Sequence, residues 1–168
     1  MKTLKLTAQD FEPNYPCNYI GKEAVANFDG HIEIEGGISW VKFTRLAATG
    51  HIWAGAGTGI KAGTSIEAGT GIKAGEGIEA GLSITCKLVL KFNYRLFAGV
   101  AVWRDMGDEE KKITCGKLEG GTVCYGDVEE LGLPEPEPTP EQPKLTELTL
   151  DEIADKFGVP VEELRIKE

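Results

Sequence analysis

This sequence of 168 residues lacks most of the features that would identify a chemistry directly. It has two histidines and no C-x-x-C pair among its four cysteines, so neither a zinc site nor any other cofactor is predicted. No apolar run approaches the roughly 18 residues of a membrane-spanning helix, and the N-terminal stretch has no signal-peptide core. We therefore expect a soluble, cytoplasmic protein with no membrane partner.

Nucleotide-binding loops are missing as well. The sequence contains 22 glycines, yet no G-x-x-x-x-G-K-[ST] motif and no collagen-like period of three. The stretch GAGTGI superficially fits a dinucleotide motif, but the spacing of the surrounding repeats explains its glycines better as corners. A glycine content above the usual share of about 7% indicates a turn-rich architecture.

The formal net charge of −9 is concentrated near the C-terminus. From Pro134 onward there are ten acidic and four basic residues, a net charge of −6, which leaves −3 for residues 1–133. Direct binding of nucleic acid is not expected for a chain that is acidic overall.

The most regular feature is a hexad repeat between residues 60 and 84. An isoleucine returns every sixth residue, an Ala-Gly pair follows it, and the residue between them alternates between Lys and Glu. Short strands with an inward isoleucine and a glycine corner are typical of a triangular left-handed parallel β-helix. The corner glycines are expected to adopt positive φ. The isoleucines predicted to fill the axis are Ile60, Ile66, Ile72, Ile78 and Ile84.

The alternating charges predict the length of one coil. Stacked strands lie about 4.8 Å apart, so a coil of about 18 residues places Lys61 beside Glu79. A coil of about 12 residues would place Lys61 beside Lys73, which is repulsive, so three-sided coils are favoured. Glu76 is an exception, because it stands where sister hexads carry threonine. It should point inward, which is costly unless that corner is open to water or paired.

The hexads alone make fewer than two coils, so the flanking segments must complete the domain. Residues 83–103 form a long β-prone stretch, and residues 113–128 read as two strands of a hairpin around a Glu-Gly-Gly turn. Whether Cys115 and Cys124 form a disulfide depends on the register of these strands, so both possibilities stay open. The predicted fold is mainly β: a short β-solenoid of the left-handed triangular β-helix type with flanking antiparallel strands and a small C-terminal helix pair.

Composition divides the chain into three parts. Residues 1–133 are the β-solenoid domain with its flanking strands, residues 134–143 are a Pro-rich acidic linker, and residues 144–168 are a helical mini-domain. In the last part, Thr149 and Glu152 form a capping box between the linker and the first helix. The helix pair either caps the solenoid or docks on a partner, and the sequence leaves this open.

Two resemblances rest on these residues. The hexads are similar to those of hexapeptide-repeat left-handed β-helix proteins, a class that includes many acyltransferases and is commonly homotrimeric. A more specific resemblance, to a family encoded by phages and prophages of Gram-positive bacteria, implies a phage accessory protein that acts in a bacterial cytoplasm. It is carried, in this order, by the segments GEGIEAGLSITCKLVLKF, LFAGVAVWRD and EEKKITCGKLEGGTVCYGDV.

A catalytic role has only two candidate residues. The resemblance to acyltransferases implies a histidine base, and His31 and His51 are the only histidines. Each precedes an isoleucine, at an outward strand position that is usually just solvated. Acid–base catalysis would need a partner carboxylate and a cleft, and the sequence supplies neither. We therefore predict that the protein is not an enzyme.

A binding role has a clearer candidate. Lys87, Lys91 and Arg95 share one parity of the stretch 83–103, and Tyr94 adjoins Arg95. Such a face can bind phosphates or an acidic patch on a partner. A solvated strand face is the alternative.

The leading functional hypothesis is a non-enzymatic phage accessory protein that binds and inhibits a host protein. A defence nuclease of the CRISPR type is one such partner, because acidic surfaces can occupy its basic channels. A small-molecule-binding sponge or scaffold oligomer is the second hypothesis, and a hexapeptide-type acyltransferase is the third. Self-association into a dimer or trimer is expected, because a short solenoid exposes flat faces and an open end.

Overall fold

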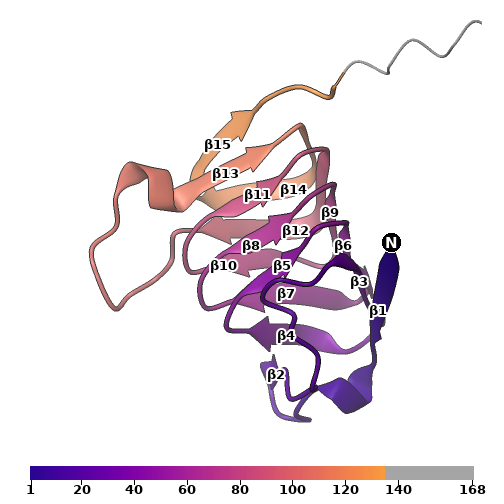
Figure 1. Cartoon of the computed structure of the whole chain (residues 1–168). Coiled ribbons are helices and arrows are strands. Elements are labelled where there is room, and N and C mark those ends of the chain that lie inside the picture. The colour runs from indigo at the N-terminus through magenta and orange to yellow at the C-terminus, as the bar shows by residue number, and fades with distance from the viewer. Residues whose placement is uncertain (135–168) are drawn as a thin grey trace, which may run out of the picture. The chain divides into compact units, whose positions relative to one another are not determined.

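The computed structural model describes residues 1–134, which form one unit, Met1–Pro134. In this unit the strands lie above one another like the steps of a stack (Figure 1). A second unit, Glu135–Glu168, lies outside the described residues, and with it most of the predicted linker and the whole predicted helix pair. Within residues 1–134, no helix has the length and apolar character needed to cross a membrane.

Short strands make up most of the described chain. Two short 3₁₀ helices interrupt them, η1 (Ala8–Asp10) and η2 (Asp108–Lys111). The strands are β1 (Lys2–Leu6), β2 (Cys17–Asn18), β3 (Gly30–Ile34), β4 (Ser39–Phe43), β5 (Leu46–Ala48), β6 (Ile52–Ala56), β7 (Thr58–Ala62), β8 (Ile66–Ala68), β9 (Ile72–Gly75), β10 (Ile78–Ala80), β11 (Ile84–Cys86), β12 (Val89–Ala98), β13 (Lys112–Cys115), β14 (Lys117–Tyr125) and β15 (Asp127–Glu130).

The backbone pairing arranges these strands in three stacks, all of them parallel. The first stack is β1, β3, β6, β9 and the N-terminal halves of β12 and β14. The second is β2, β4, β7, β10 and the C-terminal halves of β12 and β14. The third is β5, β8, β11, β13 and β15. Consecutive strands thus belong to different stacks, and each strand pairs with a strand one round of the chain away.

The register in the hexad region confirms the predicted spacing. Ile60 pairs with Ile78 and Ile66 pairs with Ile84, so neighbours in a stack are 18 residues apart. Lys61 pairs with Glu79 in the same ladder, and their side chains form an ion pair of 2.6 Å between Nζ and Oε1. The alternating charges therefore indicate the coil length correctly, because the attractive arrangement is the one that forms.

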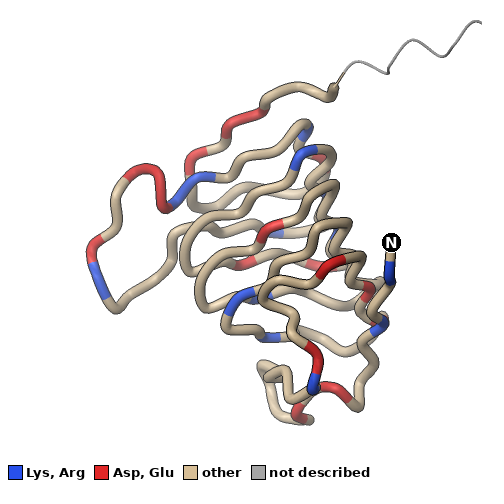
Figure 2. Tube along the Cα trace, viewed as in Figure 1, with Lys and Arg blue, Asp and Glu red and all other residues tan. Residues whose placement is uncertain are grey.

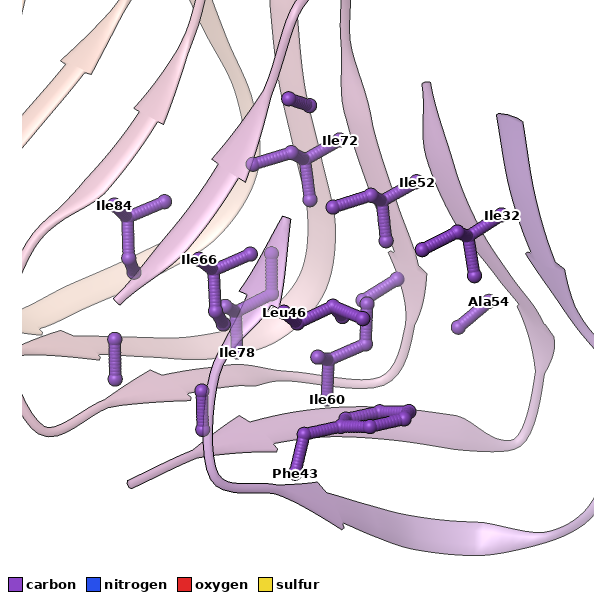
Figure 3. Close-up of a cluster of buried hydrophobic side chains, with 14 of the residues drawn as sticks. Ile32, Phe43, Leu46, Ile52, Ala54, Ile60, Ile66, Ile72, Ile78 and Ile84 are labelled. Carbon is purple, nitrogen blue, oxygen red and sulfur yellow. The ribbon is translucent and has the colours of Figure 1, made fainter. Parts of the chain in front are cut away.

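The interior is filled by the predicted isoleucines. All five have at most 1% of their surface exposed, and Figure 3 shows side chains from successive strands lying in rows that point to a common core. Phe43, Leu46 and Phe92 extend this core beyond the repeats and are equally buried. Burying each large aliphatic side chain contributes about 1.5–3 kcal/mol, so the rows are the main source of stability.

The corner glycines have a different role from the predicted one. None of the glycines that end the hexads adopts positive φ. A Cβ added at Gly69, Gly75 or Gly81 would lie within 2.0 Å of a backbone carbonyl oxygen of the neighbouring round. Glycine is needed there because two backbones approach each other closely, not because of left-handed geometry.

The prediction of flanking antiparallel strands is wrong. Residues 117–125 form the single strand β14, which pairs in parallel with β12. Gly120 and Gly121 do not make a turn: an added Cβ would meet the carbonyl oxygens of Phe92 and Tyr94 at 1.7 and 2.0 Å. As at the corners, these glycines mark a close approach of two backbones.

Glu76 does not point into the core. It is half-buried and lines an open hollow on the second stack. Thr58, one round earlier, is fully buried, and its hydroxyl donates to the Glu35 carbonyl (2.9 Å) and accepts from the Ile38 N–H (3.2 Å). The inward position is therefore compatible with a hydrogen-bonded threonine, whereas the carboxylate at the same position turns to solvent.

Between β12 and β13 the chain leaves the stacks. Residues 99–111 form an excursion that contains η2 and extends to the left in Figure 1. Within it, Arg104 Nη1 lies 2.9 Å from Glu110 Oε2. The exposed Trp103 also belongs to this excursion.

Candidate functional site

Trp40 forms the floor of the candidate site, on the second stack. Its indole lies across two successive rounds: an added Cβ would meet ring atoms at 2.7 Å from Gly59 and 2.9 Å from Gly77. The preceding residue, Ser39, has a φ of 75°, which a residue with a side chain rarely adopts. Trp40 therefore lies flat on the stack because two glycines leave room for it.

An open hollow of about 560 Å³ surrounds this tryptophan. Tyr15 and Tyr94 are largely exposed at 74% and 66%, whereas Trp40 is half-buried. The lining combines aromatic and charged side chains from three separated segments. They are Tyr15, Pro16, Trp40, Lys61, Glu76, Glu79, Tyr94, Arg95 and Phe97.

The charges in this hollow divide into a closed pair and two open groups. Lys61 and Glu79 neutralise each other at 2.6 Å. Glu76 and Arg95 form no ion pair with any residue of the described chain 1–134. Figure 2 shows the same mixture more widely, with basic and acidic residues interleaved along the strands rather than gathered in a patch of one sign. The site therefore offers aromatic surface with one free charge of each sign.

The structure separates the four predicted binding residues. Tyr94 and Arg95 lie together in the Trp40 hollow. Lys91 lies on the first stack, where its Nζ is 3.4 Å from Glu119 Oε2. Lys87 borders a hollow on the third stack. Strand β12 passes from the first stack to the second between Lys91 and Leu96, so residues of one parity do not share one face. Binding by Tyr94 and Arg95 stays a prediction.

Sequence reasoning missed Trp40, Tyr15 and Phe97, because only the folded chain brings them together. One signal was available. Gly59 and Gly77 precede their isoleucines exactly one coil apart, whereas the third-stack hexads carry serine at this position, at Ser65 and Ser83. Glycine restricted to one stack indicates that something large lies over that stack.

The two histidines are stacked on the first stack. The rings of His31 and His51 lie 4.0 Å apart, and His51 stacks on Trp53 at 3.9 Å. His31 Nδ1 accepts a hydrogen bond from the His51 backbone N–H (3.0 Å). Burial, followed by the neighbouring His31, lowers the pKa of His51, and Glu33 opposes this shift. Both rings are half-buried rather than simply solvated, and their contacts are those of packed rings rather than of an exposed base.

The four cysteines are all free thiols. Cys115 is buried and Cys124 is exposed, so no disulfide joins them. Burial, with the nearby Cys115, raises the pKa of Cys86 to about 12, and burial with Glu130 raises the pKa of Cys115 to about 11. Because the thiolate is the reactive form, these two residues serve as small core side chains.

Comparisons with protein-family models, with curated proteins and with solved structures find no match to this chain. Its function is therefore inferred from the geometry of its sites. Among residues 1–134, no group of three or more His, Cys, Asp or Glu side chains is placed to hold a metal ion.

Proposed function

We propose that this domain is a short triangular β-solenoid of the left-handed β-helix type that acts as a rigid platform for binding another protein. Three parallel stacks with a spacing of 18 residues support the solenoid. The observation that carries the binding role is the hollow around Trp40.

The composition of this hollow matches that of protein–protein interfaces. Tryptophan, tyrosine and arginine are the residues that most often dominate binding energy, and they do so where they cluster around a pocket. Trp40, Tyr94 and Arg95 form such a cluster, held on strands rather than on loops. The internal Lys61–Glu79 pair limits the charge that must be desolvated on binding.

The partner is a host protein in the bacterial cytoplasm, in keeping with the resemblance to phage-encoded proteins. A defence nuclease is the most specific version of this proposal. Arg95 and Glu76 would pair with charges of the partner, which selects against partners with the wrong pattern. No bond is made or broken in this role, so the protein would act by occupying a surface.

Capture from a bacterial lysate tests the proposal if it is combined with site variants. Full-length tagged protein should retain a specific protein, and the identified partner, once purified, should bind with a measurable Kd. The double variant Tyr94→Ala, Arg95→Glu should weaken this binding at least tenfold, which is about 1.4 kcal/mol. Both side chains are exposed, so the variant should fold normally.

Two controls make the result specific. Trp103→Ala removes an exposed aromatic side chain from the excursion, and Lys87→Glu changes a charge on the third stack. Neither should alter the affinity. Equal capture by the double variant and the unmodified protein would show that the Trp40 hollow is not the binding site.

Self-association belongs to the same proposal. Strand β15 is the last of its stack, with one edge unpaired among the described residues, and its acidic residues Asp127, Glu129 and Glu130 repel an identical edge. A dimer or trimer would therefore form through the side faces of the stacks rather than by joining two β15 edges. Light scattering at micromolar concentration tests this: a strictly monomeric mass would exclude it.

A further inference from the structure

A second ladder of outward side chains follows the first stack and is independent of the Trp40 hollow. Each member lies in register with the next across neighbouring strands. The ladder is Lys5, Glu33, Trp53, Lys73, Lys91 and Glu119.

The charges of this ladder break the rule that the hexads otherwise follow. With alternating signs and a spacing of 18 residues, the position beside Lys73 should be acidic, yet it is Lys91. Two cations on adjacent strands are destabilising. Lys91 is partly compensated by Glu119 at 3.4 Å, but Lys117 also binds Glu119, at 2.9 Å. Lys73 has no carboxylate partner in the described chain, so the ladder keeps uncompensated positive charge.

Trp53 adjoins this pair and is fixed in place. It pairs in register with Lys73, and 46% of its surface is exposed. His51 covers one face of the indole at 3.9 Å with an interplanar angle of 16°, and His31 supports His51 from behind. An exposed tryptophan held flat by a stacked ring is prepared to stack on a further planar group.

The other side of Trp53 is open. Two residues further along β6 and β9 the chain carries Gly55 and Gly75, so no side chain fills the space beside the indole. A hollow of about 480 Å³ lies there, bordered by Trp53, Lys73 and Lys91 and closed by Asn93, whose amide donates to the Gly75 carbonyl (2.7 Å). This bay joins a bare backbone floor, a flat aromatic wall and two ammonium groups.

We propose that this bay binds a nucleotide, with the base stacked beside Trp53 and the phosphates held by Lys73 and Lys91. Stacking on an aromatic side chain and contact with lysines are the two interactions that recognise nucleotides without a phosphate-binding loop. The ladder is bounded by Glu33 on one side and Glu119 on the other, which would repel a longer polyanion. The ligand is thus a mononucleotide rather than a nucleic acid strand. This ligand site is additional to the proposed protein-binding hollow and does not depend on it.

Calorimetric titration of the full-length protein with ADP tests the proposal. ADP should bind, and adenosine and inorganic phosphate should each bind at least tenfold more weakly than ADP. Trp53→Ala and Lys73→Glu should each reduce the ADP affinity at least tenfold, whereas Trp53→Phe should retain most of it. Trp103→Ala and Lys87→Glu are the matched controls and should leave the affinity unchanged.

Each contrary outcome overturns a defined part. Absence of ADP binding at millimolar concentration, or binding unaffected by both Trp53→Ala and Lys73→Glu, would exclude the nucleotide site. Equal binding of phosphate and ADP would reduce it to a simple anion site. Tighter binding of a single-stranded oligonucleotide, increasing with its length, would replace the mononucleotide by a strand. Because these variants lie outside the Trp40 hollow, protein capture should be unchanged in all of them.

Discussion

Two stacks of the same domain each carry a tryptophan, but they treat their charges in opposite ways. Beside Trp40, Lys61 is closed by Glu79 at 2.6 Å. Beside Trp53, Lys73 faces Lys91. The core beneath the two sides is built alike, so the difference does not come from the requirements of folding. It shows that the repeat fixes the inward positions and leaves the outward ladder free to acquire binding functions.

The largest expected effect comes from removing the support common to both sides. Ile72 pairs with Ile52 and Leu90 and is 1% exposed. Ile72→Asp places an unpaired charge in the core and should cost several kcal/mol, enough to abolish cooperative unfolding near 25 °C. Circular dichroism during heating measures this.

The conservative variant Ile72→Val is the control for that experiment. It removes one methylene and should lower the free energy of unfolding by only about 0.5–1.5 kcal/mol. A melting temperature of Ile72→Asp equal to that of the unmodified protein would contradict the stacked core.

The second prediction separates close backbone approach from turn geometry. In Gly75→Ala the new Cβ would lie 2.0 Å from the Gly55 carbonyl oxygen, beneath the Trp53 bay. The strands must separate there, which should cost about 1–3 kcal/mol in urea unfolding. Gly63→Ala is the matched control, because its Cβ would lie at an ordinary 3.4 Å from the Thr44 carbonyl oxygen.

Gly63→Ala should change the stability by no more than about 0.5 kcal/mol. Equal losses in the two variants would mean that the hexad glycines serve backbone conformation after all. Selective loss in Gly75→Ala would show that the bay keeps its bare floor because of packing between neighbouring rounds.

These two tests mark how far the sequence predicts the fold. The inward rows and the position of Lys61 beside Glu79 follow from periodicity, since a repeat of six allows one register with attractive charges. The direction of β14 did not follow, because Gly120 and Gly121 resemble a turn unless the neighbouring backbone of β12 is known. Long-range close contacts leave the same sequence pattern as tight turns.

The candidate site was predictable only in part. Tyr94 and Arg95 were identified as binding residues from their exposure-prone pattern, and they do lie side by side in the hollow. Their partner Trp40 lies more than 50 residues earlier and reaches them only through two rounds of the chain. Lys87 and Lys91 were grouped with them because the turn of β12 between stacks has no signal in a sequence of alternating side chains.

A smaller effect concerns pH on the Trp53 side. The pKa of His51 is lowered by burial and by His31, so the unfolded chain binds a proton more readily than the folded one. The free energy of unfolding should therefore fall as the pH drops below about 6.5, the ordinary histidine value. His51→Gln should reduce this acid sensitivity, as measured by melting temperatures between pH 7.5 and 5.5. Identical pH profiles would show that His51 does not contribute.

The smallest effect is also the one that most sharply distinguishes the two sides. Lys73→Glu replaces a repulsive neighbour of Lys91 by an attractive one and should raise the stability by a few tenths of a kcal/mol, as exposed cross-strand pairs do. Glu79→Lys is the mirror change, since it turns the Lys61–Glu79 attraction into repulsion, and it should lower the stability by a similar amount. Both shifts should shrink in 1 M salt, where charges are screened over about 3 Å. A variant that becomes more stable while it loses ADP would identify Lys73 as a residue kept for binding at the expense of folding. If Lys73→Glu were instead destabilising, Lys73 would have a structural role, and the argument from broken alternation would fail.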